Sequence, residues 1–261
     1  MSNNKQVIFR KKLLPALAVI LLISLFVIFF MVSRAKAISD RDANIIGCFI
    51  EWFGVLYGVL LALVVVEVWH RYSQINAEVD READALVLLL KTTSYLKDKS
   101  KLHVLARNAL EYSKIMLQAE GSQDFAQIKA NKKLEEIHSN VGNILNDAEL
   151  PLPLSLEILR YINDAIDLRG DWLARARERM PRGIWGLVVV TSLFWVLGFF
   201  GLNIESDTLA FMLCGISTFT VSSIIFIIAD LDDPIGGVWR VRFESFELLQ
   251  SEARNLLNIN A

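Results

Sequence analysis

Residues 45–69 read IIGCFIEWFGVLYGVLLALVVVEVW, and this stretch determines the fold of the rest of the chain. A helix rises 1.5 Å per residue, so about 20 apolar residues cross the roughly 30 Å hydrocarbon core of a bilayer. Beyond the stretch, apolar residues continue at three- and four-residue steps without Gly or Pro, at Tyr72, Ile75, Val79, Ala83, Leu86 and Leu90. We therefore predict one helix that runs from the membrane into water and ends near Leu96.

Three further apolar stretches have the length of membrane spans, at about 13–33, 184–202 and 208–229. The first follows Lys11 and Lys12 and precedes Ala35-Lys36-Ala37, an arrangement that cleavable signal peptides share. Its apolar run is longer than the core of a typical signal peptide, so we favour an uncleaved span. Only residues 203–207 separate the third span from the fourth, which predicts a tight antiparallel hairpin.

Basic residues near the span ends predict the orientation, because cytoplasmic loops carry an excess of Lys and Arg. With four spans, one side holds Lys5, Arg10, Lys11, Lys12, Arg71, Arg175, Arg177, Arg179, Arg182, Arg240 and Arg242. The other side holds Arg34, Lys36 and Arg41, diluted by Asp40 and Asp42. Both termini and the segment between the second and third spans are therefore expected in the cytoplasm.

The segment 70–183 shows helical rather than strand-like periodicity. After the long helix we expect helices at about 99–119 and 124–146, the latter with Asp124 as its N-cap. A further helix follows Pro151 and Pro153, with a stripe of Leu156, Leu159, Ile162, Ile166 and Leu173. Beyond the fourth span, Phe243, Phe246, Leu249 and Leu256 predict an amphipathic helix that packs on this bundle or lies against the membrane.

The predicted fold is all-α, with four transmembrane helices and a cytoplasmic helical bundle inserted between spans two and three. Its parts are a membrane pair at 1–69, a helical domain at 70–183, a membrane hairpin at 184–229 and a C-terminal segment at 230–261. A single subunit with few polar groups in its spans makes a poor pore, so we expect a homo-oligomer in contact with membrane lipid. Span two or span four would line its axis.

Composition excludes several classes of function. The formal net charge of −2 gives no reason to expect nucleic acid as a partner. Cys48 and Cys214 lie in apolar stretches, and His70, His103 and His138 are dispersed, so neither a CxxC nor an HExxH metal site is present. No phosphate-binding loop, nucleophile elbow or dinucleotide motif occurs, so the chain is not expected to be an enzyme or to need an organic cofactor.

Three aspartates follow span four, and they are the first candidate site. Asp230, Asp232 and Asp233 supply oxygen ligands of the kind that Ca²⁺ or Mg²⁺ prefers, and a ring of subunits would make them an acidic collar. The alternative is structural: Asp232 and Asp233 terminate a helix before Pro234, and Asp230 pairs with Arg240 or Arg242.

Polar residues within the spans are the second set of candidates. Glu51 and Glu67 are 16 positions apart, about 24 Å along one helix, so they do not act as a pair within one chain. Each faces a cavity or partner, or else Glu67 reaches water and Glu51 pairs with a base such as Arg41. In span four, Thr218 and Ser222 share one face with Gly215, which fits a wet pore lining or close helix packing.

Three stretches carry a family resemblance: LLALVVVEVWHRYSQINAEVDREADALVLLL at 60–90, RYINDAIDLRGDWLARARERMPRGIW at 160–185 and ADLDDPIGGVWRVRFESF at 229–246. Together they resemble the bacterial bestrophin-like membrane proteins, a family of largely unknown function. Its usual string Asp-Leu-Asp-x-Pro-x-x-Gly-x-x-Arg-Val is matched by Asp230, Leu231, Asp232, Pro234, Gly237, Arg240 and Val241. This chain departs from the family at Asp233, where Arg or Lys is common, and at Ile235, where Phe is common.

The resemblance implies a bacterial inner membrane and kinship to anion channels in which an acidic cluster after a transmembrane helix binds calcium. We therefore expect a subunit of an oligomeric channel that passes inorganic ions, with a cation at the aspartate cluster as a regulator. An acidic collar facing the pore would favour cations, whereas the kinship favours chloride with a calcium latch. The alternative is a membrane-tethered scaffold or sensor that acts through its cytoplasmic bundle, which the long amphipathic helices also fit.

Overall fold

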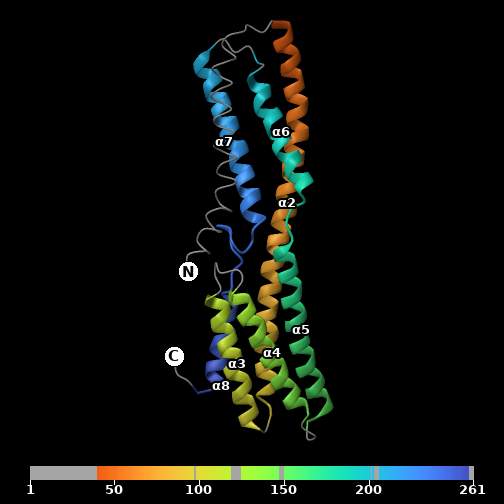
Figure 1. Ribbon diagram of the computed structural model, residues 1–261, viewed down its shortest axis with the longest axis vertical. Helices are drawn as coiled ribbons and strands as arrows, with labels where there is room; N and C mark the ends of the chain where they lie inside the picture. Colours follow the sequence, from red (N-terminus) through yellow and green to blue (C-terminus); the bar gives the residue numbers. More distant parts are fainter. Residues whose placement is uncertain are drawn as a thin grey trace. The chain divides into compact units, whose positions relative to one another are not determined.

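The computed structural model describes residues 40–96, 98–118, 125–146, 150–200, 202 and 206–258. These residues form helices and no strand, which confirms the all-α prediction (Figure 1). The helices are α2 (Asp40–Thr93), α3 (Lys99–Gln118), α4 (Phe125–Leu145), α5 (Leu152–Arg177), α6 (Arg182–Phe200), α7 (Asp207–Leu231) and α8 (Ser245–Leu256). The predicted first span and the predicted N-cap Asp124 lie outside the described residues.

The chain divides into two compact units, and each is described by itself. The first, here the apolar unit, comprises residues 1–70 and 179–232. The second, here the helical unit, comprises residues 71–178 and 233–261. The divisions fall after His70, Glu178 and Asp232. The four expected parts, with boundaries at 69, 183 and 229, stay a prediction.

Helix α2 is continuous for 54 residues, as the uninterrupted periodicity predicts. In the helical unit its stripe is buried, with Ile75, Val79 and Leu90 fully so, and Tyr72 half-buried. The helix ends at Thr93, three residues earlier than expected. There the Thr93 hydroxyl donates to the carbonyl oxygens of Leu89 and Leu90, each at 2.9 Å.

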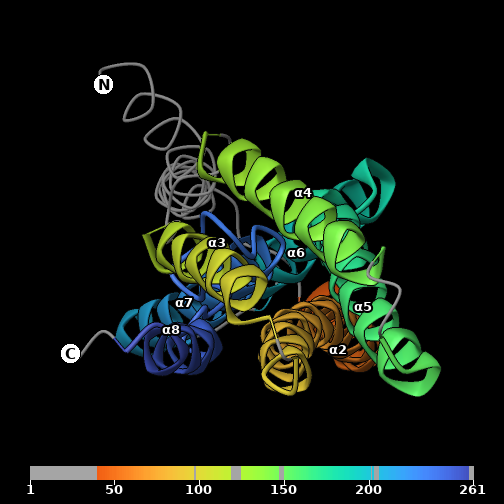
Figure 2. The ribbon, with the colours of Figure 1, turned by 90° about the horizontal axis from the view of Figure 1, so that it is seen from below.

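The core of the helical unit is built from α2, α3, α4, α5 and α8 (Figure 2). The predicted C-terminal amphipathic helix packs on this bundle: α8 contacts α3, and the ring of Phe246 lies edge-on to Tyr112 at 5.8 Å between centroids. Phe243 is buried as well, against Trp172 at 6.1 Å. Aromatic burial on this scale stabilises the docking of a short helix.

The predicted stripe on α5 is right in its second half and wrong in its first. Ile162 and Leu173 are buried and Ile166 packs against the core, but Leu156 and Leu159 are 57% and 39% exposed. The buried face of α5 is instead Ile158, Ile162, Ala165, Arg169, Trp172, Leu173 and Ala176. Because one residue is a 100° rotation on a helix, Leu159 cannot share the face of Ile158.

In the apolar unit, α6 and α7 occupy the positions of the predicted third and fourth spans. Within the described part of the chain, α2 alone is long and apolar enough to cross a membrane, or two spans qualify if α5 and α6 form one broken span. The apolar segment Gly215–Leu231 of α7 is shorter. The count of four spans therefore stays a prediction.

Candidate functional site

Gly54 and Gly58 of α2 have the GxxxG spacing that permits close approach of another helix. A Cβ atom at Gly54 would collide with the six-membered ring of Trp195 on α6, so only glycine lets that indole lie on the α2 backbone. Gly58 has no such neighbour within 4 Å. The close approach therefore occurs at Gly54 and not at Gly58, because Gly58 lies on the exposed side of α2.

The same contact between α2 and α6 contains one polar pair. The hydroxyl of Tyr57 lies 2.7 Å from the hydroxyl of Ser192, and both side chains are buried. The Tyr57 ring stacks on Trp195 at 5.8 Å between centroids. Between two apolar helices in lipid, such a hydrogen bond would satisfy groups that lipid cannot and fix the register of the helices.

The opposite face of α2 is apolar and exposed. Its residues follow one another at four- and three-residue steps, namely Ile45, Phe49, Trp52, Leu56, Val59, Leu63 and Val66. All seven are at least 50% exposed, and we call this set the open face of α2. No described element of the chain covers it, so lipid or another copy of the chain is expected to do so.

Glu51 and Glu67 are both exposed and border the open face. Their 16-residue separation corresponds to a rotation of about 160°, so they lie on opposite edges of that face. No ion pair joins Glu51 to Arg41, both of which the structure describes. The structure therefore does not bring these two predicted site residues together within one chain.

The predicted hydroxyl face of α7 is buried. Thr218 and Ser222 are 7% and 8% exposed, and neither hydroxyl oxygen has a hydrogen-bond partner, nor does that of Ser217. Ser223, one residue on, donates to the Phe219 carbonyl oxygen at 2.8 Å. Unpaired hydroxyls in an apolar environment are costly, which favours water or a polar group of a neighbouring copy as their partner in the assembled protein.

Among the three predicted aspartates, Asp232 is the most buried, at 9% exposure. It is the C-cap of α7, and its Oδ1 accepts the backbone N–H of Met180 at 2.8 Å. Its backbone oxygen accepts a bond from the Arg179 guanidinium. These bonds tie the residues just before α6 to the end of α7. Asp230 lies half-buried on the last turn of α7.

Asp233 begins the turn that follows α7. Its Oδ1 accepts the N–H of Gly236 at 3.2 Å, and its carbonyl accepts the N–H of Gly237 at 2.8 Å. Arg240 is exposed, with its Nε donating to the Gly237 carbonyl at 2.9 Å. The Arg240 carbonyl in turn accepts the hydroxyl of Tyr72 on α2 at 3.0 Å, so this turn is anchored within the helical unit.

The predicted calcium site is not complete in one chain. In the ranges that the structure describes, no three His, Cys, Asp or Glu side chains are arranged to hold a metal ion. One Asp232 oxygen is already used by a backbone N–H. A calcium ion prefers six to eight oxygen ligands, so these residues do not fit it unaided.

The sequence did not identify a buried polar cluster in the helical unit, here called the Glu82 cluster. Glu82 of α2 is fully buried and accepts bonds from the Tyr112 hydroxyl and from Trp172 Nε1, the latter at 2.6 Å. Arg169, 4% exposed, places Nη1 3.8 Å from the Glu82 carboxylate. Its Nη1 also donates to the Tyr112 hydroxyl at 3.1 Å, and its Nε donates to Asn131 at 3.1 Å.

Burial raises the pKa of Glu82 above its ordinary value of 4.5, and the positive charge of Arg169 opposes this rise. The pKa of Tyr112 is raised well above 10, by burial and by the negative charge of Glu82. Tyr112 is therefore a permanent hydrogen-bond donor near neutral pH. The signal for this cluster was in the spacing, because Glu82 stands between Val79 and Leu86 on the buried stripe and Arg169 between Ala165 and Trp172.

The arrangement is that of an all-helical protein with long apolar helices and a polar helical bundle, and it has counterparts among solved structures. A bacterial bestrophin homologue from Klebsiella pneumoniae, in a form with one substitution, is 12% identical with a TM-score of 0.68, covering 99% of this chain and 98% of that one. A second variant of that homologue is 13% identical with the same TM-score, covering 97% and 98%. A structure described as a membrane protein has 13% identity and a TM-score of 0.64.

The Bestrophin-like domain matches residues 16–246 of the sequence, so the chain belongs to the Bestrophin-like family of membrane proteins. The match includes Asp230, Asp232 and Asp233 and most of both units. At 12–13% identity the solved structures establish the fold and nothing finer. No curated protein matches the chain.

Proposed function

We propose that the chain is a subunit of a homo-oligomeric ion channel in a bacterial inner membrane, through which inorganic ions pass passively. Family membership and the bestrophin fold support it. The proposal includes four membrane helices per subunit, with both termini in the cytoplasm. The observation that carries it is the open face of α2, an apolar surface that the described part of the chain leaves uncovered.

In a ring of subunits the open face would border the central axis. A row of bulky apolar side chains such as Leu56, Val59 and Leu63 then forms a narrow passage. Such apolar constrictions block ions when water leaves the passage. Replacing one apolar side chain by a hydroxyl would wet the passage and raise the flux. The proposal therefore predicts that a polar substitution on this face increases activity rather than abolishing it.

Ion preference would come from the acidic groups at the cytoplasmic end of α7. Asp233 is half-buried in a turn that several hydrogen bonds hold, so a ring of copies would present one fixed carboxylate per subunit. Rings of Asp or Glu favour cations in channels. We therefore propose cation preference, with a cation bound between copies as the regulator, since the described residues of one chain hold no group of three metal ligands.

The test is ion flux through purified protein in liposomes, with K⁺ and Cl⁻ gradients measured separately. Leu63→Thr should raise the flux several-fold. Val190→Thr on α6 is its control, because Val190 is also an exposed apolar residue, at 48%, but lies on another helix, and it should change nothing. Asp233→Asn should reduce the ratio of K⁺ flux to Cl⁻ flux. An absence of flux from folded, oligomeric protein would refute the channel and favour the membrane-tethered scaffold.

A further inference from the structure

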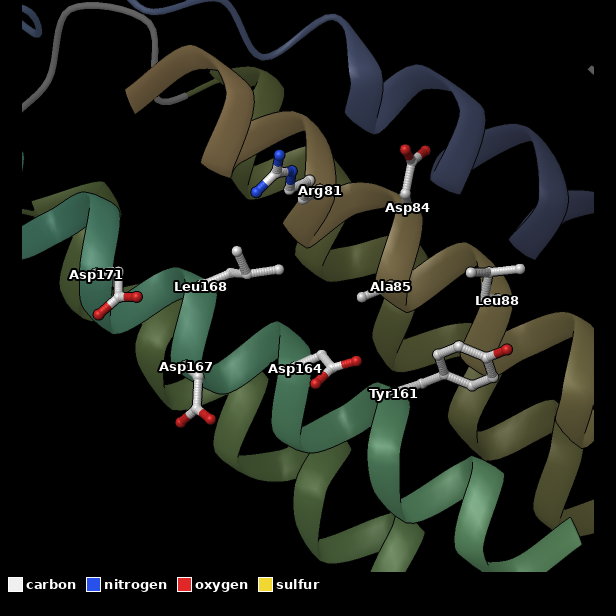
Figure 3. Close-up of a pocket in the computed structure, with 9 residues that line it drawn as sticks. All are labelled: Arg81, Asp84, Ala85, Leu88, Tyr161, Asp164, Asp167, Leu168 and Asp171. Atoms are coloured by element: carbon white, nitrogen blue, oxygen red, sulfur yellow. The ribbon is translucent and has the colours of Figure 1, made fainter. Parts of the chain in front are cut away.

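A groove of about 380 Å³ opens between α2 and α5 on the surface of the helical unit. Its floor contains apolar side chains, among them Leu88, Tyr161 and Leu168 (Figure 3). Leu88 is 43% exposed although it is large and apolar. The groove therefore combines concavity with apolar surface, as docking sites do.

The rim of the groove is acidic. Asp84 comes from α2, and Asp164, Asp167 and Asp171 come from α5 (Figure 3). All four are exposed, and within the described ranges none of them forms an ion pair. Arg81 is the one base among the lining residues, which leaves four negative charges against one positive charge. Like charges this close repel one another, so a basic partner would be attracted.

The exposed face of α3 has the complementary character. Arg107 and Lys114 are exposed and form no ion pair within the described part of the chain. Glu111, between them, is bound by Lys133 at 2.6 Å, so its charge is already balanced. Val104, one turn before Arg107, is 51% exposed. This face thus offers two unpaired bases and one apolar side chain.

The two surfaces agree in spacing. Arg107 and Lys114 are seven residues apart, as are Asp164 and Asp171, which is about 10 Å along a helix and nearly two full turns. With Arg107 opposite Asp164, the same register places Lys114 opposite Asp171 and Val104 opposite Tyr161. Both charged pairs and the apolar pair are thus satisfied by one alignment of two parallel helices.

The groove and the α3 face also lie on opposite sides of the helical unit, as a head-to-tail ring requires. Within the helical unit, α3 and α8 are on one side and α5 is on the other in both views (Figures 1 and 2). Helices α3 and α5 run in the same direction in this unit (Figure 1). Rotation about an axis parallel to the helices keeps them parallel, so α3 of one copy can meet α5 of the next in a closed ring.

We propose that the groove between α2 and α5 binds the α3 face of a neighbouring copy of this chain, with Arg107 and Lys114 paired to Asp164 and Asp171. This contact rests on the proposed assembly into a homo-oligomer, but it needs no ion conduction. It gives the helical unit its own head-to-tail interface. Leu88, Tyr161 and Val104 form its apolar centre, and the charges set its register.

Cross-linking of the full chain in liposomes tests the contact. In a background with Cys48→Ser and Cys214→Ser, Val104→Cys and Tyr161→Cys are combined, and a short bismaleimide is added. We expect a ladder of covalent dimers and larger oligomers. Ile128→Cys with Tyr161→Cys is the control, since Ile128 is 68% exposed on α4, a helix that takes no part in the proposed contact, and this pair should stay monomeric. A ladder in both, or in neither, overturns the proposal.

Charge reversal tests the register. Asp164→Lys with Asp171→Lys, or Arg107→Glu with Lys114→Glu, should each slow cross-linking by about tenfold. All four changes together should restore the rate, which a variant that fails to fold cannot do. No slowing by either pair, or no recovery, refutes the pairing. Ion flux is measured on the same samples. Ion flux without cross-linked oligomers refutes the proposed contact but not the channel. Cross-linked oligomers without ion flux refute the channel but not the contact.

Discussion

Glu82→Ala removes the carboxylate to which Tyr112 and Trp172 donate, and it leaves Arg169 without a counter-charge in the core. Arg169 is only 4% exposed, so water cannot replace the lost partner. Breaking a buried pair by removing one member costs about 3–5 kcal/mol. At roughly 2–4 °C per kcal/mol for a domain of 150–250 residues, we expect the unfolding midpoint to fall by about 10 °C.

The assay is thermal unfolding of the full-length protein in detergent, followed by tryptophan fluorescence because Trp172 lies in the cluster. Glu82→Leu and Arg169→Met are also made singly and together. The double variant should be more stable than either single variant, because it leaves no unpaired charge. A loss in the double variant equal to the sum of the two single losses would show that Glu82 and Arg169 are not energetically coupled, and the reasoning would be wrong.

The pKa of Glu82 adds a dependence on pH to this prediction. Because burial raises its folded-state pKa, the folded protein holds the proton more tightly than the unfolded chain does. The resulting contribution to stability is fully present below pH 4.5 and is lost as the pH rises through the raised pKa. Glu82→Gln should flatten this part of the pH profile of the unfolding midpoint. If the unfolding midpoint of Glu82→Gln depends on pH as steeply as that of the unchanged protein, the pH dependence comes from other groups.

Substitutions at three further positions follow from the contacts of the apolar unit, each measured by the same unfolding midpoint. Gly54→Ala should destabilise by about 1–3 kcal/mol, because its new methyl group collides with the Trp195 ring. Gly58→Ala should be neutral or stabilising by up to about 1 kcal/mol, because its surroundings are open and alanine favours helix. Equal losses of stability at Gly54 and Gly58 would contradict the packing of Trp195 against Gly54. Asp232→Ala should cost about 1–3 kcal/mol by leaving the Met180 N–H unpaired, whereas Asp232→Asn retains an acceptor and should lose less.

Much of the fold was predictable because helical periodicity is a local property of the sequence. The long helix α2 and the amphipathic α8 were found from apolar spacing alone. The error at Leu156 and Leu159 arose because apolar residues were treated as core residues, although Arg169 on α5 holds a core position that Leu159 does not. A charged side chain is assigned to the surface until its partner is known, and Glu82 lies 87 positions away from Arg169 in the sequence.

The candidate site was less predictable, since its residues depend on what other helices bring to them. The acids after α7 were recognised as a group, but sequence could not show that Asp232 accepts a backbone bond from Met180, 52 positions earlier. Thr218 and Ser222 were placed on one face correctly, yet only packing shows that they are buried without partners. Long-range contacts of this kind carry no local signal.

Helix α2 itself indicates where its surroundings change. The open face ends at Val66, and the positions that continue its three- and four-residue steps are His70, Ser73, Ala77, Asp80 and Asp84, all exposed. The buried face, by contrast, stays apolar past this point, at Val68, Ile75 and Val79. A change on one face alone is what the proposed membrane boundary near Trp69 would produce, because an apolar medium favours apolar side chains and water favours polar ones.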